Sequence, residues 1–200
     1  PLSPDAAPAP YALFKRDDPR LPGLFWTAAD PALFATQRAL AGTDARPFVA
    51  LAGSAPDVAA ARSAHLLWFG IDGDTDTATA SEWATDFQRP VSLQPDAGSV
   101  VTNTPGDLNH DGFNESEGVY ELSLERGTVR FVFDPGDTPR NSPVLRIHET
   151  RRRRCWAYVN GAALPADVRD AEGNVLITLP GSIRSPRQVE IHTREAELGR

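Results

Sequence analysis

The sequence has little of several residue types, and each shortage excludes a class of structure. It has a single cysteine, Cys155, so no disulfide can form within the chain. It has no apolar run of about 18 residues or more, which predicts that no helix spans a membrane. Positive charge is nearly all arginine, with Lys15 the only lysine. The formal net charge of −7 argues against nucleic acid as the main partner.

Methionine is also absent, and the chain begins at Pro1, so we expect a processed mature chain or a fragment. A hydrophobic content of 40% is sufficient for one core, held by packing and by metal rather than by disulfides. Residues 1–23 are rich in proline and alanine at their start and predict an extended segment. A single domain is expected over residues 24–200.

One stretch has the residue spacing of a metal-binding loop. Oxygen-bearing side chains recur at alternate positions from Asp107, and Gly112 stands at position six, where a tight turn is needed. Calcium takes roughly 6–8 oxygen ligands, which such a loop can supply from side chains and a backbone carbonyl. The expected calcium loop covers residues 107–117, and its ligands are Asp107, Asn109, Asp111, the carbonyl of Phe113, Glu115 and Glu117.

This loop resembles the DxDxDG calcium loops of EF-hands, dockerins and integrin-type propellers, and the nine-residue propeller form is the nearer match. No amphipathic helix flanks it, so the resemblance implies a calcium loop and not an EF-hand domain. A stabilising role is implied, because a closed cage of oxygens leaves no position for a substrate. The alternative is an Asn-, Asp- and Gly-rich turn that binds no metal.

A second acidic turn follows a continuous apolar run. The run over residues 65–72 predicts a buried strand with Trp68 in the core. The turn has acids at alternate positions but no glycine after the third, so it is either a second calcium site or a solvated loop; its acids are Asp72, Asp74 and Asp76.

Helix signals are confined to the N-terminal third. Asp30 is a suitable N-cap for a helix over residues 30–42, and a second short helix is expected over residues 54–62. A strand is expected between them, over residues 46–51, and another over residues 90–93.

After the acidic loop, strand signals follow one another at short intervals. Alternating apolar residues predict strands over residues 119–124, 128–133, 143–148, 155–159, 174–179 and 188–193. Tight turns separate them at Glu125–Gly127 and at Asn160–Gly161. The fold class expected is mostly β, an antiparallel β-sandwich or jelly roll with one or two short helices in the N-terminal third.

The order of these C-terminal strands and turns looks like the β-sandwich regions attached to secreted bacterial polysaccharide-degrading proteins. The stretch from Asp111 to Tyr120 is similar to segments of large secreted bacterial proteins. This resemblance implies an extracellular, carbohydrate-associated module, and it transfers no catalytic residues.

Aromatic and arginine side chains are the candidate ligand contacts. Trp83, in a polar segment, is the best candidate among the tryptophans for an exposed ring, and Trp156 alternates with Tyr158 on one face of a strand. These three residues are therefore the candidates to stack on sugar rings. The run 151–154 is four arginines, and Arg152 and Arg154 would grip an anionic polysaccharide. The alternative is a solvated basic loop.

The sequence favours a non-catalytic carbohydrate-binding or accessory module. Its four histidines are scattered, and it contains neither a HExxH nor a G-x-S-x-G motif. One alternative is a polysaccharide lyase or hydrolase, or its tail domain, using residues such as Tyr120, Tyr158, His148 and Arg146. Another is a subunit of an extracellular filament or surface layer, docked through its N-terminal segment.

Overall fold

The computed structural model describes residues 11–14, 20, 22–29, 64–72, 74–150 and 153–195. The chain divides into two compact units, Pro1–Arg89 and Pro90–Arg200. The sequence-based boundary at residue 23 differs from this division, which falls after Arg89. The elements expected over residues 30–42, 46–51 and 54–62, and the segment 1–10, lie outside the described residues.

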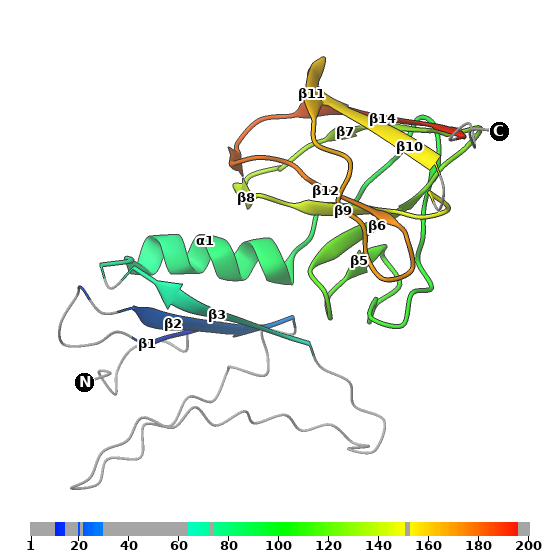
Figure 1. The fold of residues 1–200 in the computed structure, drawn as a ribbon. Helices are drawn as coiled ribbons and strands as arrows, with labels where there is room; N and C mark the ends of the chain where they lie inside the picture. The colour runs from blue at the N-terminus through cyan, green and yellow to red at the C-terminus, as the bar shows by residue number, and fades with distance from the viewer. Residues whose placement is uncertain are drawn as a thin grey trace, which may run out of the picture. The chain divides into compact units, whose positions relative to one another are not determined.

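The described residues of the first unit form a three-stranded antiparallel sheet and one helix (Figure 1). The sheet has the order β1 (Tyr11–Phe14), β2 (Gly23–Ala28) and β3 (His65–Ile71), and the helix is α1 (Thr77–Gln88). Its core is a cluster of Phe25, Ile71, Ala80 and Ala84, with Leu13 and Trp83 among the partly buried residues packed against it.

Helix α1 begins at a side-chain cap. The Asp76 carboxylate accepts a hydrogen bond from the Thr79 amide at 2.7 Å, as an N-cap residue does. The buried positions Ala80, Ala84 and Phe87 recur on one face of the helix. Two of these three residues are alanines, so the apolar stripe is weak in the sequence and the helix was not predicted there.

The second unit consists mainly of two β-sheets (Figure 1). One has the order β11 (Ala162–Leu164), β10 (Arg153–Val159), β14 (Arg187–Glu195) and β7 (Thr128–Phe133). The other has the order β12 (Val175–Thr178), β9 (Val144–Ile147), β6 (Val119–Ser123) and β4 (Ser99–Val100), with β5 (Phe113–Asn114) also paired to β6. A short ladder joins β8 (Arg140–Asn141) and β13 (Ser182–Ile183).

The core of the second unit lies between its two sheets. Alternate residues of each sheet are fully buried, among them Phe131 and Ile191 from one sheet and Leu145 and Ile177 from the other. The ring of Tyr120 on β6 meets that of Phe133 on β7 edge to face, with centroids 5.7 Å apart. The mostly β, sandwich-like class expected from the sequence is therefore confirmed. One pair departs from the antiparallel pattern, because β6 and β9 are parallel.

All six strands expected after the loop are present, and so are both tight turns. Arg126 and Gly127 have φ angles of 51° and 81°, and Asn160 and Gly161 have 47° and 80°. Positive φ at both central residues is what a type I′ hairpin turn requires. The strand expected over residues 90–93 is wrong, because no strand forms there.

Two predictions about tryptophan are corrected by the first unit. Trp68 is 45% exposed and not in the core, because β3 is the outer one of the three described strands of its sheet. Trp83, the best candidate for an exposed tryptophan, packs instead against the core cluster and meets Phe25 edge to face at 5.5 Å.

Candidate functional site

The acidic loop folds around the buried carboxylate of Asp107, which is 3% exposed. This carboxylate accepts hydrogen bonds from the Gly112 amide at 2.9 Å and from the Asp111 amide at 3.2 Å. Gly112 has φ of 90°, and a Cβ there would lie 1.9 Å from Cγ1 of Val100. The glycine is therefore required both for the turn and for the close approach to the sheet.

Short side-chain turns shape the next residues of the loop. Oδ1 of Asn109 accepts a hydrogen bond from the Asp111 amide at 3.0 Å, and Oδ1 of Asp111 accepts one from the Phe113 amide at 2.8 Å. The Asn109 amide group also donates to Oδ2 of Asp111 at 3.0 Å. Asparagine and aspartate are suited to such turns, which explains the local fold without any metal.

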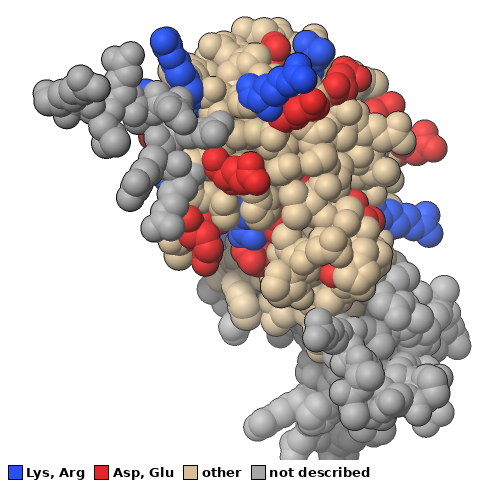
Figure 2. Space-filling view, turned by 90° about the vertical axis from the view of Figure 1, so that its right-hand side faces the viewer, with Lys and Arg blue, Asp and Glu red and all other residues tan. Residues whose placement is uncertain are grey.

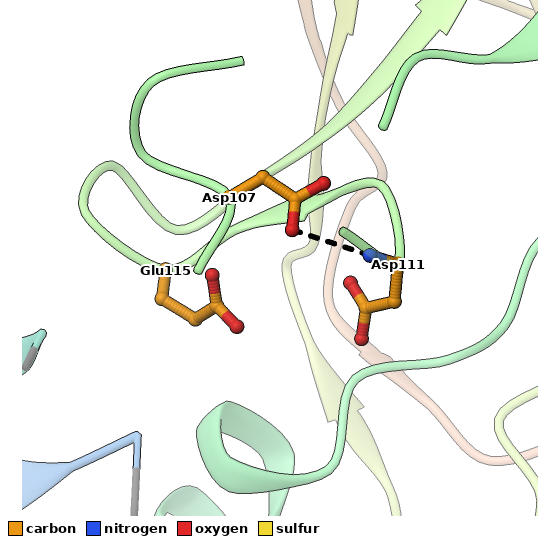
Figure 3. Close-up of side chains that lie close together, drawn as sticks. All are labelled: Asp107, Asp111 and Glu115. Atoms are coloured by element: carbon orange, nitrogen blue, oxygen red, sulfur yellow. Dashed lines mark hydrogen bonds between the residues drawn. The ribbon is translucent and has the colours of Figure 1, made fainter. Parts of the chain in front are cut away.

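Three carboxylates converge inside the loop. One oxygen each from Asp107, Asp111 and Glu115 lies within 4.8 Å of the others. Figure 3 shows these three side chains turned toward one another. Glu115 is 6% exposed and accepts a hydrogen bond from the Leu108 amide at 2.8 Å, which ties its carboxylate to the start of the loop. In the part of the chain that the structure describes, no other group of three metal-ligating side chains comes so close.

The electrostatics of the loop favour a positive charge among these groups. Burial raises the pKa of Glu115, and the neighbouring charges of Asp111 and Asp107 raise it further, against hydrogen bonds that lower it. Carboxylate oxygens are ligands for hard divalent cations such as Ca²⁺. The arrangement can therefore hold such a cation.

The remaining predicted ligands are Asn109, the carbonyl of Phe113, and Glu117. Asn109 is exposed at the edge of the loop, and Phe113 belongs to β5, with its ring buried against Tyr120. The carboxylate of Glu117 pairs with the guanidinium of Arg146, outside the group of three. Glu117 is thus engaged in a different set of contacts from the one expected.

The second acidic turn does not gather its carboxylates in this way. Its three acids are exposed, and no group of three metal-ligating residues includes any of them. Asp76 caps α1, and the carbonyl of Asp72 accepts a hydrogen bond from the Thr75 amide at 3.1 Å. Among the described residues of the turn, Asp76 therefore has a local structural role, as the N-cap of α1.

A buried charged cluster beside the acidic loop was not identified from the sequence. Glu121 on β6 is fully buried, and its carboxylate accepts hydrogen bonds from Arg146 at 3.0 Å, His148 at 2.7 Å and Asn114 at 2.9 Å. The Nε atom of Arg146 lies 3.1 Å from the carboxylate of Asp170, an ion pair without the alignment of a hydrogen bond. The sequence did contain a signal for this cluster, namely Glu121 within a mainly apolar strand. A buried acid needs hydrogen-bonding or charged partners.

This cluster holds Glu121 in its charged form. Burial raises the pKa of Glu121, but hydrogen bonds from His148 and Asn114 and the charge of Arg146 outweigh it, so the pKa lies below its usual value. Asn114 directly precedes Glu115, and it thereby connects the acidic loop to the cluster.

The candidate ligand residues of β10 lie on the face of the sheet that turns away from the core. Ala157 and Val159 are buried, whereas Trp156 is 41% exposed and Tyr158 is partly exposed. Arg154 is exposed on the same face, because alternate residues of a strand share a face. Trp83 belongs to the other unit, and Arg152 lies outside the described residues.

The residues considered for a lyase do not form one group. Arg146 and His148 both contact Glu121, but Tyr120 is its neighbour on β6 and therefore points to the opposite face, into the core. Tyr158 lies in the other sheet.

No described helix is long and apolar enough to cross a membrane. The chain matches no protein-family model, and neither the comparison with curated proteins nor the comparison with solved structures found a similar one.

Proposed function

We propose that the loop from Asp107 to Glu115 binds Ca²⁺ and that the ion stabilises an extracellular β-sandwich module. The observation that carries this proposal is the convergence of three carboxylates, two of them buried, within 4.8 Å of one another. Without a cation these charges repel one another, so an ion bound among them would relieve the repulsion.

The role proposed for the ion is structural because the loop is bonded directly to the sheet. The Glu121 amide donates a hydrogen bond to the carbonyl of Gly112 at 2.8 Å, and the Val101 amide donates one to the carbonyl of Glu121 at 2.9 Å. An ion that fixes the loop therefore also fixes β6 and the segment after β4. Extracellular modules use calcium sites that fill at millimolar concentrations, which suits a secreted protein.

The test is calcium titration by calorimetry, together with thermal unfolding with and without a chelator. Calcium at about 100 times its dissociation constant is expected to stabilise the fold by about 2.7 kcal/mol. Asp111→Asn is the informative variant, because asparagine retains an oxygen that can accept the Phe113 amide but removes the charge. We expect it to weaken calcium binding about tenfold or more.

Glu172→Gln is the matched control, because Glu172 is an exposed acid outside the group of three carboxylates, and this variant should bind calcium as the parent does. A parent protein that takes up no calcium and melts at the same temperature with the chelator would overturn the proposal.

We further propose that the module binds glycans through the outward face of β10. The supporting observation is the exposed ring of Trp156, with Tyr158 next to it on the same face. Flat aromatic surface with a polar edge suits the apolar faces of sugar rings.

Affinity electrophoresis in gels that contain polysaccharide tests this second function. We expect the parent to be retarded by at least one polysaccharide and Trp156→Ala to lose most of that retardation. Trp68→Ala is the matched control, since Trp68 is exposed to a similar extent in the other unit. Equal mobility of the parent in gels with and without every polysaccharide would refute the glycan-binding role.

A further inference from the structure

The register of β10 and β14 places a strip of side chains together on one face. Arg154 is opposite Arg194, Trp156 is opposite His192, and Tyr158 is opposite Glu190. Opposed residues of an antiparallel pair point to the same side of the sheet and lie within contact distance. The strip therefore has two arginines at one end and aromatic groups behind them.

This strip faces away from the core. The residues that alternate with it, Ala157 on β10 and Val189 and Ile191 on β14, are buried in the sandwich. Arg154 and Arg194 are both exposed. The strip is thus available to a ligand on the described surface of the unit.

The two arginines are directly opposed across the β10–β14 ladder, and neither has an acidic partner among the described residues. Like charges directly opposite each other in a sheet are destabilising. Two other arginines of the unit do have acidic partners: Arg146 lies among three acids, and Arg130 is 3.8 Å from Asp96. Figure 2 shows acidic and basic groups side by side in several places on the face that it draws.

The one acid on the strip, Glu190, lies at the end away from the two arginines and has neighbours of its own. Glu190 lies 3.1 Å from His192, and the register places it opposite Arg130 of β7 on its other side. The positive charge at the arginine end is therefore left for an external anion, although the whole chain carries −7.

We propose that the glycan bound by this face is an acidic polysaccharide. Sugar rings lie on Trp156 and Tyr158, and carboxylate or sulfate groups of the sugar bind Arg154 and Arg194. A guanidinium fork matches both anions with two parallel hydrogen bonds. This inference rests on the proposed glycan-binding function.

The experiment compares polymers that differ in charge. Affinity electrophoresis is run with polygalacturonate for the carboxylate, dextran sulfate for the sulfate, dextran and xylan as neutral polymers, and a thymidine oligonucleotide. The variants are Trp156→Ala and the double variant Arg154→Gln/Arg194→Gln. The matched control is Arg89→Gln/Arg187→Gln, which also removes two positive charges. Arg89 is exposed in the other unit, and Arg187 is partly buried at the far end of β14, opposite Phe133 of the core face.

We expect the parent to bind one acidic polymer about tenfold or more tightly than either neutral one, and the double variant to lose that preference. The control should keep it within about twofold. Binding should also weaken between about 50 and 200 mM salt. The melting temperature of the double variant should not fall, because a repulsive pair has been removed. Which acidic polymer binds identifies the anion as carboxylate or sulfate.

Three results would overturn the inference in distinguishable ways. Binding to no polysaccharide removes the glycan-binding function itself. Binding to neutral polymers that depends on Trp156 but not on the two arginines keeps that function and removes the acidic ligand. Binding of the oligonucleotide as tightly as the acidic polymers identifies a general anion surface instead.

Discussion

Glu121 is the residue on which the charged cluster beside the loop depends. Its carboxylate is fully buried and is the shared partner of Arg146 and His148. Glu121→Gln removes the negative charge and leaves the mostly buried guanidinium of Arg146 without its innermost partner. We therefore expect the free energy of unfolding to fall by about 3–5 kcal/mol, measured by urea denaturation.

Glu190→Gln is the control for this change, because Glu190 pairs with His192 on the exposed face of the other sheet. It should alter the free energy of unfolding by less than about 1 kcal/mol. Equal losses of unfolding free energy in the two variants would mean that the buried contacts of Glu121 stabilise the fold no more than the exposed contact of Glu190.

The pH dependence of stability follows from the lowered pKa of Glu121. Burial acts to raise this pKa, but the hydrogen bonds and the charge of Arg146 leave it lower in the folded state than in the unfolded chain. The charged group therefore contributes stability above its unfolded pKa of about 4.3, and that contribution is lost as the pH falls toward the folded value. The stability difference between the parent and Glu121→Gln should be constant above about pH 6 and should shrink below about pH 4. A difference that grows on acidification would contradict this sign.

Spacing along the chain explains which site residues were predictable. Asp107, Asp111 and Glu115 come together within one loop, so their spacing alone placed them at one site. Glu121 and Arg146 are 25 positions apart, and only the parallel pairing of β6 with β9 brings them together. Sequence-local reasoning has no access to such a pairing.

At the scale of elements, alternation predicted strands well and periodicity failed for the helix. The strands of the second unit alternate large apolar and polar residues, as β7 does with Val129, Phe131 and Phe133 inward. Helix α1 turns mainly small residues, Ala80 and Ala84, to its sheet, so its pattern is weak. Its clearest signal was the cap at Asp76, which the alternate acidic spacing made look like part of a metal site.

The turn at Gly112 is where the loop and the sheet constrain each other. Gly112→Ala would strain a residue with φ of 90° and also drive Cβ to 1.9 Å from Val100. Gly161→Ala is the matched change, since φ is 80° there and nothing lies within 4 Å of the new Cβ. We expect about 1 kcal/mol of destabilisation at Gly161 and clearly more at Gly112, by urea denaturation in the presence of calcium. Equal losses would show that the close approach to Val100 is relieved without cost.

At the scale of the whole molecule, the pattern of strands and turns predicted a protein dominated by β-sheet but not its division into two units. The apolar run over residues 65–71 looked like an inner strand of a single sandwich. It is an edge strand of a separate unit, with Leu67, Trp68 and Phe69 exposed. Composition reports how much apolar surface a chain has, but not between which layers it is placed.

The division into units determines how far an effect of calcium should reach. The three carboxylates all belong to the second unit, and the amides of Asp111, Gly112 and Glu121 take part in the hydrogen bonds that hold the loop. Adding a chelator to the calcium-loaded protein should therefore speed hydrogen exchange at these three amides. Local opening of a loop exposes the amides that it protects while leaving remote ones closed.

Two amides, one in each unit, serve as internal controls in the same experiment. In the first unit the Ala29 amide bonds to the carbonyl of Ala64, and in the second the Thr193 amide bonds to the carbonyl of Gly127, away from the loop. Their exchange should not change with the chelator. Faster exchange at all of these amides would mean that calcium supports the chain as a whole, and no change at any of them would mean that the loop holds its shape by its side-chain turns alone.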